Sequence, residues 1–249
     1  MPVIPTMDPA AFSEFVRSRR SCRDFEAKDV DEALLREVLD DAKWAPSWCN
    51  TSPYHIVMAR GAQKDRIKEK LLAKYDAAMA AKGIFGKLGL WLTGGAPDGD
   101  YDNQLSYTPE LNVHRKACGF GLYDLLGIKK DDMAGRNEQV RKNFEFFGAP
   151  VVFFVFVQGD MGVFSPLDAG FYLQNLLLSA HARGLATCAQ GALATWKSPI
   201  VEEFPIPKGY KLICGVSMGY ASSHVINTFN PGRRDVNGIS FKQDAPSKT

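Results

Sequence analysis

The sequence has 249 residues, and its 30 Lys and Arg face 28 Asp and Glu, which gives a net charge of +2. Binding along a nucleic-acid backbone needs a concentrated basic surface, so this near-balance predicts no nucleic-acid partner. Hydrophobic residues make up 45% of the chain and charged residues 23%. That composition is typical of a folded globular protein and excludes a disordered chain.

The N-terminus has no basic stretch followed by an apolar stretch, so a signal peptide is not predicted. The longest apolar run, Val151–Val157, is far shorter than the ~20 residues that cross a bilayer, and no membrane partner is expected. The five cysteines include no C-x-x-C pair, and the four histidines no H-x-x-x-H pair. Neither a disulfide framework nor a metal site is predicted, and a cytoplasmic location is expected.

Helices and strands are expected to alternate through the first third of the chain. Asp8-Pro9 and Asp31 have the residue types of helix starts, and Pro46 enforces an end before it. The predicted elements are a helix to about Ser18, a helix from Asp31, a strand at Tyr54–Arg60 and a helix at Lys64–Ala81.

The Gly83–Gly99 segment holds six glycines around Leu90 and Trp91. Such a glycine density disfavours regular structure, so the segment is interpreted as an irregular or mobile part of a variable insertion at about 83–112. A plain surface loop is the alternative.

The second half repeats the mixture of helices and strands. Val151–Val157 is apolar throughout, as is typical of a central strand buried on both faces. Ser165-Pro166-Leu167-Asp168 is similar to a capping box, with Gly184 as the matching stop. The remaining predictions are helices at Val113–Leu126 and Asp131–Phe147, a strand at Lys211–Tyr220, and an extension at about 221–249 that packs on something else, such as a partner subunit. The whole chain, 1–249, is predicted to be one domain.

Two short motifs point to chemistry that their surroundings do not support. Gly215-Val216-Ser217-Met218-Gly219 matches the nucleophile elbow of α/β-hydrolases. That fold needs an acid and then a histidine after the serine, but no acid lies between Ser217 and the single later histidine, His224. Small residues in a tightly packed strand explain it better. Gly119-Phe120-Gly121 lacks the third glycine of a dinucleotide fingerprint, and no P-loop sequence is present.

Four other segments carry groups suited to binding a phosphate or the polar edge of a ring. Arg19, Arg20, Ser21 and Arg23 follow the first helix, and guanidinium groups bind phosphate bidentately. Taken alone, a run of arginines is more often a solvated surface patch. The other three segments are the Pro46–Tyr54 loop with Ser47, Trp48 and Asn50, the small-residue stretch 184–193 with Ala189, Gln190 and Gly191, and the pair Arg233 and Arg234.

In this order the segments RRSCRDF, PSWCNTSPY, GLATCAQG and the late basic pair resemble the FMN-dependent nitroreductase family over nearly the whole chain. The resemblance implies an α+β fold, with a mixed and mainly antiparallel sheet wrapped by helices. It also implies an intertwined homodimer with FMN at the subunit interface and a C-terminal extension that crosses to the partner.

The resemblance further implies which residues bind the cofactor. Arg19, Arg20, Ser21 and Arg23 occupy the phosphate, ribityl and ring-edge positions, and Arg233 and Arg234 the phosphate position in the tail. The loop from the other subunit is represented by Pro46, Ser47, Trp48 and Asn50. Ala189, Gln190 and Gly191 match the turn at flavin N5, and Ala189 stands where relatives carry a bulkier residue. Asp168 matches a polar position at the flavin, although capping its own helix is an equal alternative.

The implied activity is reduction of nitroaromatic, quinone or similar electron-poor acceptors, with NADH or NADPH delivering hydride to FMN in a ping-pong cycle. The flavin carries the chemistry, so no catalytic side chain and no metal are predicted. The alternatives are a specialised reductive dehalogenase or dehydrogenase of the same fold, or a flavin-binding redox module without turnover. The variable segments leave the acceptor open; within Asn143–Phe147, Phe144 and Phe147 are expected on one helix face, in the core rather than at the substrate.

Overall fold

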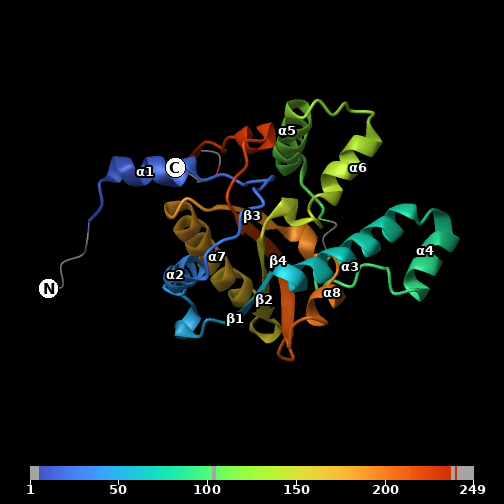
Figure 1. Ribbon diagram of the computed structural model, residues 1–249, viewed down its shortest axis with the longest axis horizontal. Coiled ribbons are helices and arrows are strands. Elements are labelled where there is room, and N and C mark those ends of the chain that lie inside the picture. The colour runs from blue at the N-terminus through green and yellow to red at the C-terminus, as the bar shows by residue number, and fades with distance from the viewer. Residues whose placement is uncertain (1–5, 103–104, 237–238, 240–249) are drawn as a thin grey trace, which may run out of the picture.

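The computed structural model describes residues 6–102, 105–236 and 239. In it, helices surround a single central sheet, while α1 and the α3–α4 hairpin project at opposite ends of the longest axis (Figure 1). The helices are α1 (Pro9–Ser18), α2 (Glu32–Ala42), α3 (Gly61–Ala80), α4 (Gly83–Leu92), α5 (Pro109–Leu125), α6 (Met133–Arg141), α7 (Phe164–Ala182) and α8 (Ser198–Val201). The strands are β1 (Tyr54–Arg60), β2 (Val151–Gln158), β3 (Ala186–Gln190) and β4 (Tyr210–Gly219). Short 3-10 turns are η1 (Trp48–Asn50), η2 (Phe146–Gly148), η3 (Gly159–Met161), η4 (Gly191–Ala194) and η5 (Val225–Thr228).

The four strands form an antiparallel sheet in the order β1-β2-β4-β3. β2 lies in the middle, and each of the residues Val151–Val157 is almost fully buried, as the continuous apolar run predicts. The sequence did not identify β3 as a strand. Ser21 adds a parallel bridge to Thr187 on the free edge of β3, so the sheet is mixed there. The predicted α+β class is confirmed.

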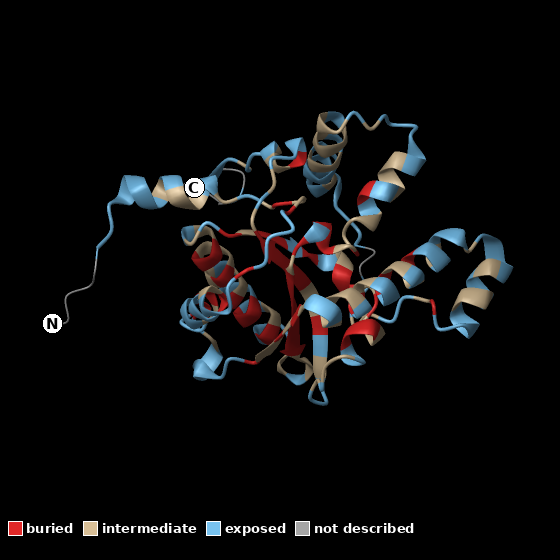
Figure 2. Ribbon diagram, viewed as in Figure 1, coloured by how far each residue is buried: buried red, intermediate tan, exposed pale blue. Residues whose placement is uncertain are grey.

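Each face of the sheet packs against its own layer of helices. Val151, Phe153 and Val155 point toward α2 and α7, and the alternate residues of β2 point toward α3. Figure 2 shows the buried residues concentrated where the layers meet. Burying a side chain of this size contributes about 1.5–3 kcal/mol. The sheet and its three covering helices therefore form the stable frame on which the loops are held.

The predicted helix starts at Asp8 and Asp31 are confirmed. The Asp8 carboxylate accepts hydrogen bonds from the backbone N–H groups of Ala10 and Ala11, both at 3.2 Å. Asp31 does the same for Ala33 at 2.8 Å. These bonds satisfy N–H groups that have no partner inside the helix, and each such cap stabilises a helix by about 1 kcal/mol.

The prediction of an irregular segment at Gly83–Gly99 is wrong for its first half, which forms helix α4. Each glycine makes helix formation less favourable by about 1 kcal/mol relative to alanine, so other interactions must stabilise α4. The apolar residues that remain exposed on α4 fall at the spacing of one helix face. They are Ile84, Phe85, Leu88, Trp91 and Leu92. Helix α4 ends where Gly94 adopts a φ of 70°.

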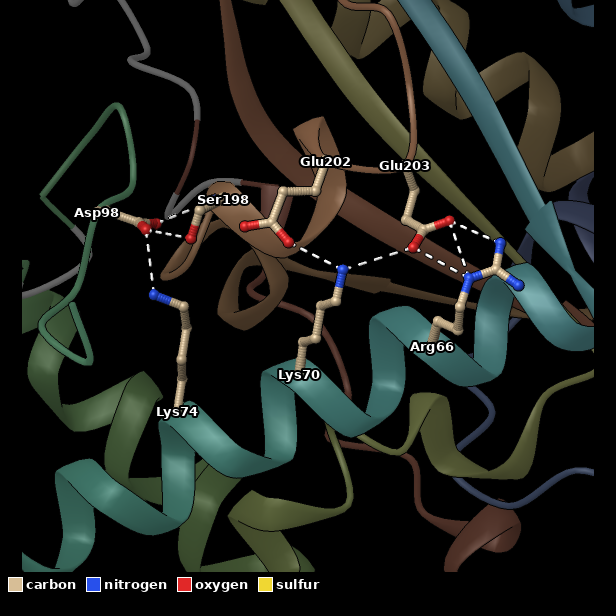
Figure 3. A network of polar contacts seen from close by, with 7 residues as sticks. All are labelled: Arg66, Lys70, Lys74, Asp98, Ser198, Glu202 and Glu203. Carbon is tan, nitrogen blue, oxygen red and sulfur yellow. Dashed lines mark hydrogen bonds and ion pairs between the residues drawn. The ribbon is translucent and has the colours of Figure 1, made fainter. Parts of the chain in front are cut away.

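The segment after α4 is fixed to the body of the protein by a network of polar contacts (Figure 3). The Asp98 carboxylate accepts hydrogen bonds from the Ser198 hydroxyl and from the backbone N–H of Lys197, both at 2.5 Å, and pairs with Lys74 of α3 at 3.4 Å. Burial favours a higher pKa for Asp98, but the hydrogen bonds from Ser198 and Lys197 outweigh it and the pKa is lowered.

Nearer the start of α3, two basic residues extend the same network by pairing with two acidic residues that follow α8. Lys70 pairs with Glu202 at 2.8 Å, and Arg66 pairs with Glu203 at 2.8 Å. Because these contacts and those of Asp98 join α3 to both α8 and the 94–98 segment, α4 projects from an anchored base.

The predicted helix at Asp131–Phe147 is too long, since α6 ends at Arg141. The Asn143 side chain donates a hydrogen bond to the Val140 carbonyl at 3.0 Å and so competes with the helical pattern. Phe146 and Phe147 then adopt left-handed φ values of 56° and 54°. Phe144 and Phe147 are buried, so their predicted place in the core is confirmed although they share no helix face.

Part of the C-terminal extension packs on its own chain. Ala221 bridges Phe25, and Asn227 accepts a hydrogen bond from the Arg23 backbone N–H at 2.8 Å. Ile226 is buried. The expectation that the whole extension packs elsewhere is therefore wrong for residues 221–229. Residues 237–238 and 240–249 of that extension lie outside the described part of the chain.

Within the ranges 6–102, 105–236 and 239, no helix is both long enough and apolar enough to cross a membrane.

Candidate functional site

The Arg19–Arg23 segment lies along the free edge of the sheet, beside β3. The Cys22 backbone N–H donates to the Thr187 carbonyl at 2.9 Å, and Asn227 fixes the next residue from the other side. Asn227 also donates to the Asp24 carbonyl at 2.7 Å. Sequence reasoning missed Asn227 because its partners are about 200 positions away along the chain.

The predicted phosphate residues line a hollow of about 320 Å³, together with the Phe229–Gly232 stretch. Burial, followed by the positive charge of Arg233, lowers the pKa of Arg19. Among the described residues, no carboxylate forms an ion pair with the five guanidinium groups at this hollow. These groups belong to Arg17, Arg19, Arg20, Arg23 and Arg233. Charges gathered without a counter-ion fit an anion such as a phosphate monoester.

A second hollow, of about 370 Å³, adjoins the first and shares Arg19 and Arg20 with it. His181, in the last turn of α7, lines this hollow, and its Nε2 lies 2.7 Å from the Ser18 hydroxyl. Burial, followed by the charges of Arg19 and Arg20, lowers the pKa of His181. Sequence reasoning had assigned no role to His181, because it became a neighbour of these arginines only through folding.

The late basic pair does not act as a unit in this structure. Arg233 lines the first hollow, whereas Arg234 pairs with Glu110 of α5 at 2.7 Å. The Glu110 side chain is largely exposed, and an exposed ion pair contributes less than about 1 kcal/mol.

The predicted loop residues lie elsewhere. Pro46, Trp48 and Asn50 are exposed and Ser47 is half-buried, in and just before the turn η1. The Ser47 hydroxyl accepts a hydrogen bond from the Ser52 backbone N–H at 3.0 Å. None of these loop residues lines either hollow.

Asp168 joins this loop to α7, because its carboxylate accepts a hydrogen bond from the Trp48 backbone N–H at 2.9 Å. The alternative that Asp168 caps its own helix is wrong, since α7 begins at Phe164 and Asp168 is the fifth residue within it. The capping box at Ser165 is wrong for the same reason. The Ser165 hydroxyl is buried and has no hydrogen-bond partner among the described residues.

Ala189, Gln190 and Gly191 lie together where β3 passes into η4. The Gln190 side chain is committed to the fold: it donates to the Asn143 carbonyl at 3.0 Å and accepts from the Ser217 hydroxyl at 2.5 Å. Ala189 and Gly191 are exposed, and a Cβ on Gly191 would meet no atom within 4 Å. Both residues are therefore exposed to solvent at the end of β3.

The rejected motifs have structural explanations. Ser217 is fully buried within β4, near the end of the strand, so it is no nucleophile elbow. Gly215 and Gly219 are required by packing, since an added Cβ would lie 2.5 Å from Leu193 and 2.6 Å from Pro150. Among the described residues no group of His, Cys, Asp or Glu could hold a metal ion, and all five cysteines are free thiols.

Comparison with known proteins decides the family. Residues 16–220 match the model of the nitroreductase family. The chain belongs to that family. A 4-nitrobenzoate reductase of Nocardioides sp. (strain LMS-CY) is 34% identical over 211 residues, which cover 84% of this chain and 80% of the relative. Nitroreductase NfnB of Mycolicibacterium smegmatis is 29% identical over 100% of this chain and 96% of its own.

Solved nitroreductases have the same fold. The FMN- and NADPH-dependent NfnB from Sphingopyxis sp. strain HMH superimposes with a TM-score of 0.82 at 28% identity, covering 93% of this chain and 98% of that one. The FMN-dependent NfnB of Mycobacterium smegmatis, solved in complex with NADPH, gives 0.80 at 26% identity, covering 94% and 99%.

In this nitroreductase-family chain, the two groups of predicted site residues, the arginines and the Trp48 loop, contact opposite ends of helix α7. Asp168 contacts the Trp48 loop near its start, and His181 contacts Ser18, next to the arginines, near its end. At 1.5 Å per residue these two positions are about 20 Å apart along the axis. One chain therefore presents the two groups at opposite ends of the same helix.

Proposed function

We propose that this protein is an FMN-dependent reductase that uses NADH or NADPH to reduce nitroaromatic, quinone or similar electron-poor acceptors. The observation that carries the proposal is the group of five guanidiniums at the edge of β3, none of which forms an ion pair with a carboxylate of the described residues, in a chain of the nitroreductase family. The relatives' names support the substrate class, since they include 4-nitrobenzoate reductases and chloronitrobenzene and nitrobenzene nitroreductases.

The residues at the two hollows suit an FMN phosphate and its ribityl chain. Arg19, Arg20 and Arg233 supply charge to the phosphate, and Ser21 and Arg23 supply donors to the ribityl chain and the ring edge. Arg234 joins them when it leaves Glu110. Arginines near the pyrimidine edge would stabilise negative charge that develops there on reduction.

The end of β3 is proposed to face the reactive edge of the flavin. A bound flavin supplies hydride-transfer chemistry, and the protein orients it. Here Gly191 acts through its backbone N–H, Ala189 leaves space beside the ring, and Gln190 holds the turn in place through Asn143 and Ser217. No side chain is assigned as an acid or a base.

The protein is further proposed to act as a homodimer in which the Pro46–Asn50 loop of one subunit completes the flavin site of the other. The separation of the two groups along α7 supports this arrangement. So do the exposed apolar side chains Phe164, Leu167 and Phe171 on α7 and Phe12 on α1, which a partner subunit would cover. The chain forms one domain, 1–249, with the insertion at about 83–112 and a C-terminal extension at about 221–249, in which the part after residue 229 is proposed to reach the partner. A cytoplasmic location fits its free thiols.

The visible spectrum of the purified protein tests the cofactor, before and after anaerobic addition of NADH or NADPH. We expect a bound-flavin spectrum that bleaches, and release of FMN on denaturation. Gly191→Pro, which lacks the N–H, should bind FMN but reduce it slowly. Gly191→Ala is the matched control, because it keeps the N–H and its methyl group has room. A protein that neither contains nor takes up FMN would contradict the proposal.

A further inference from the structure

The side chain of Asp168 is a buried carboxylate with a defined partner on a distant segment. Only 3% of the residue is exposed, and its Oδ2 accepts the Trp48 backbone N–H at 2.9 Å. A buried carboxylate is costly unless it is hydrogen-bonded, so this contact is a strong constraint on both partners. It connects α7 to a turn 120 positions earlier in the chain.

The turn that Asp168 holds has an unusual backbone. Cys49, Asn50 and Ser52 adopt left-handed φ values of 49°, 56° and 46°. Non-glycine residues rarely adopt this conformation, and it persists only where the surroundings enforce it. Runs of such residues are concentrated at functional sites.

Hydrogen bonds within the turn close it on itself but do not orient it on the protein. The Asn50 N–H donates to the Ser47 carbonyl and the Thr51 N–H to the Trp48 carbonyl, both at 3.0 Å. Orientation comes from two contacts with α7. One is the Asp168 bond, and the other is the Trp48 ring, whose centroid lies 4.3 Å from that of Phe164.

We propose that Asp168 is a positioning residue that fixes the Trp48–Asn50 turn in the orientation in which it contacts the flavin of the partner subunit. The inference rests on the proposed function, because it takes that turn as part of the flavin site. Asp168 acts as a hydrogen-bond acceptor for the turn and does not touch the flavin. Its burial leaves little surface for a ligand, and one oxygen is already engaged.

Two substitutions separate the acceptor from the charge. Asp168→Asn keeps an acceptor oxygen and removes the charge, whereas Asp168→Ala removes both. We expect hydrogen exchange at the Trp48 amide to stay slow in the Asn variant and to become fast in the Ala variant. FMN affinity should fall about tenfold in the Ala variant and much less in the Asn variant, as for a lost buried hydrogen bond. At saturating FMN, the rate of flavin reduction and the flavin potential should remain those of the wild type.

Equal losses in both variants, or a shifted flavin potential in the Asn variant, would overturn the proposal in favour of direct contact through the charge. Unchanged Trp48 exchange in Asp168→Ala would also overturn it. Asp132→Ala is the control, because Asp132 likewise accepts a backbone N–H, from Gly135 at 2.8 Å, but in α6. If the wild type itself binds no FMN, the proposed function fails, while the exchange measurement still decides whether Asp168 holds the turn.

If Asp168→Ala does not fold, two substitutions of the hydrogen-bond donor, Trp48, provide a second test. Trp48→Ala and Trp48→Pro both lose the indole, but only Trp48→Pro loses the N–H. We expect the Pro variant to bind FMN more weakly than the Ala variant. Equal affinities would overturn the proposal.

Discussion

Arg19, Arg20 and His181 share one wall of the second hollow, so each changes the electrostatic environment of the others. Positive charge that is half-buried without a carboxylate destabilises the free protein slightly, and a bound phosphate removes this cost. The site is thus prepared for an anion in electrostatic terms before any anion is present.

The pKa of His181 reports that change. In the free protein, burial and the charges of Arg19 and Arg20 hold it below 6.5. An FMN phosphate bound by these arginines would offset their charge, so the pKa of His181 should rise on binding. NMR titration of the imidazole measures this, with His181→Gln to assign the signal. A pKa that is unchanged or lower with FMN would place the phosphate elsewhere.

The same shift has a consequence for stability. Below about pH 6.5 the unfolded chain binds a proton that folded His181 resists, so the free protein loses stability as the pH falls from 6.5 through the folded pKa. Because FMN raises that pKa, the loss with FMN bound should be smaller.

At the scale of elements, the sequence predicted those helices and strands that depend on local signals and missed those that depend on long-range contacts. Helix starts such as Asp8 and Asp31 depend on the next three residues, and the run Val151–Val157 carries its own evidence of burial, so these elements were predicted. Helix α4 and strand β3 depend on contacts that are distant in sequence, or on apolar spacing hidden by glycines. The early end of α6 depends on the Asn143 side chain, which competes with the helical hydrogen bonds although the apolar pattern continues.

The candidate site divides in the same way. Its arginines and loop residues lie in contiguous motifs and could be predicted. The contacts Trp48–Asp168, Arg23–Asn227 and Arg234–Glu110 span more than 100 positions each and only the fold creates them. Short motifs therefore identified the groups, and the structure supplied the partners that orient them.

Helix α4 is predicted to be marginal because of its glycines. Gly89 has no positive φ, and a Cβ there would meet no atom within 4 Å. Gly89→Ala should therefore stabilise α4 by up to about 1 kcal/mol. Hydrogen exchange of the α4 amides measures the change. Gly94→Ala is the matched comparison. Because Gly94 has a φ of 70°, this substitution should destabilise the C-terminal end of α4. Equal effects of the two substitutions on exchange would contradict the prediction that the glycines make α4 marginal.

At the scale of the whole molecule, the distance along α7 supports the proposed homodimer. The arginines lie at one end of the helix and the Trp48 turn at the other, about 20 Å away. In a two-fold symmetric dimer the same interface occurs twice, so one partner can bring its turn to the other's arginines at two equivalent sites. The central claim is that each flavin site combines the two groups from different subunits.

Complementation between variant chains tests this claim most directly. One chain carries Arg19→Ala and Arg20→Ala, the other Ser47→Ala and Asn50→Ala, and each homodimer should bind FMN poorly. In the purified heterodimer, a shared site predicts that one site carries all four substitutions and the other none, so FMN should bind at one per heterodimer with wild-type affinity. A heterodimer in which both sites stay weak would show that each subunit builds its site alone, and would contradict the account.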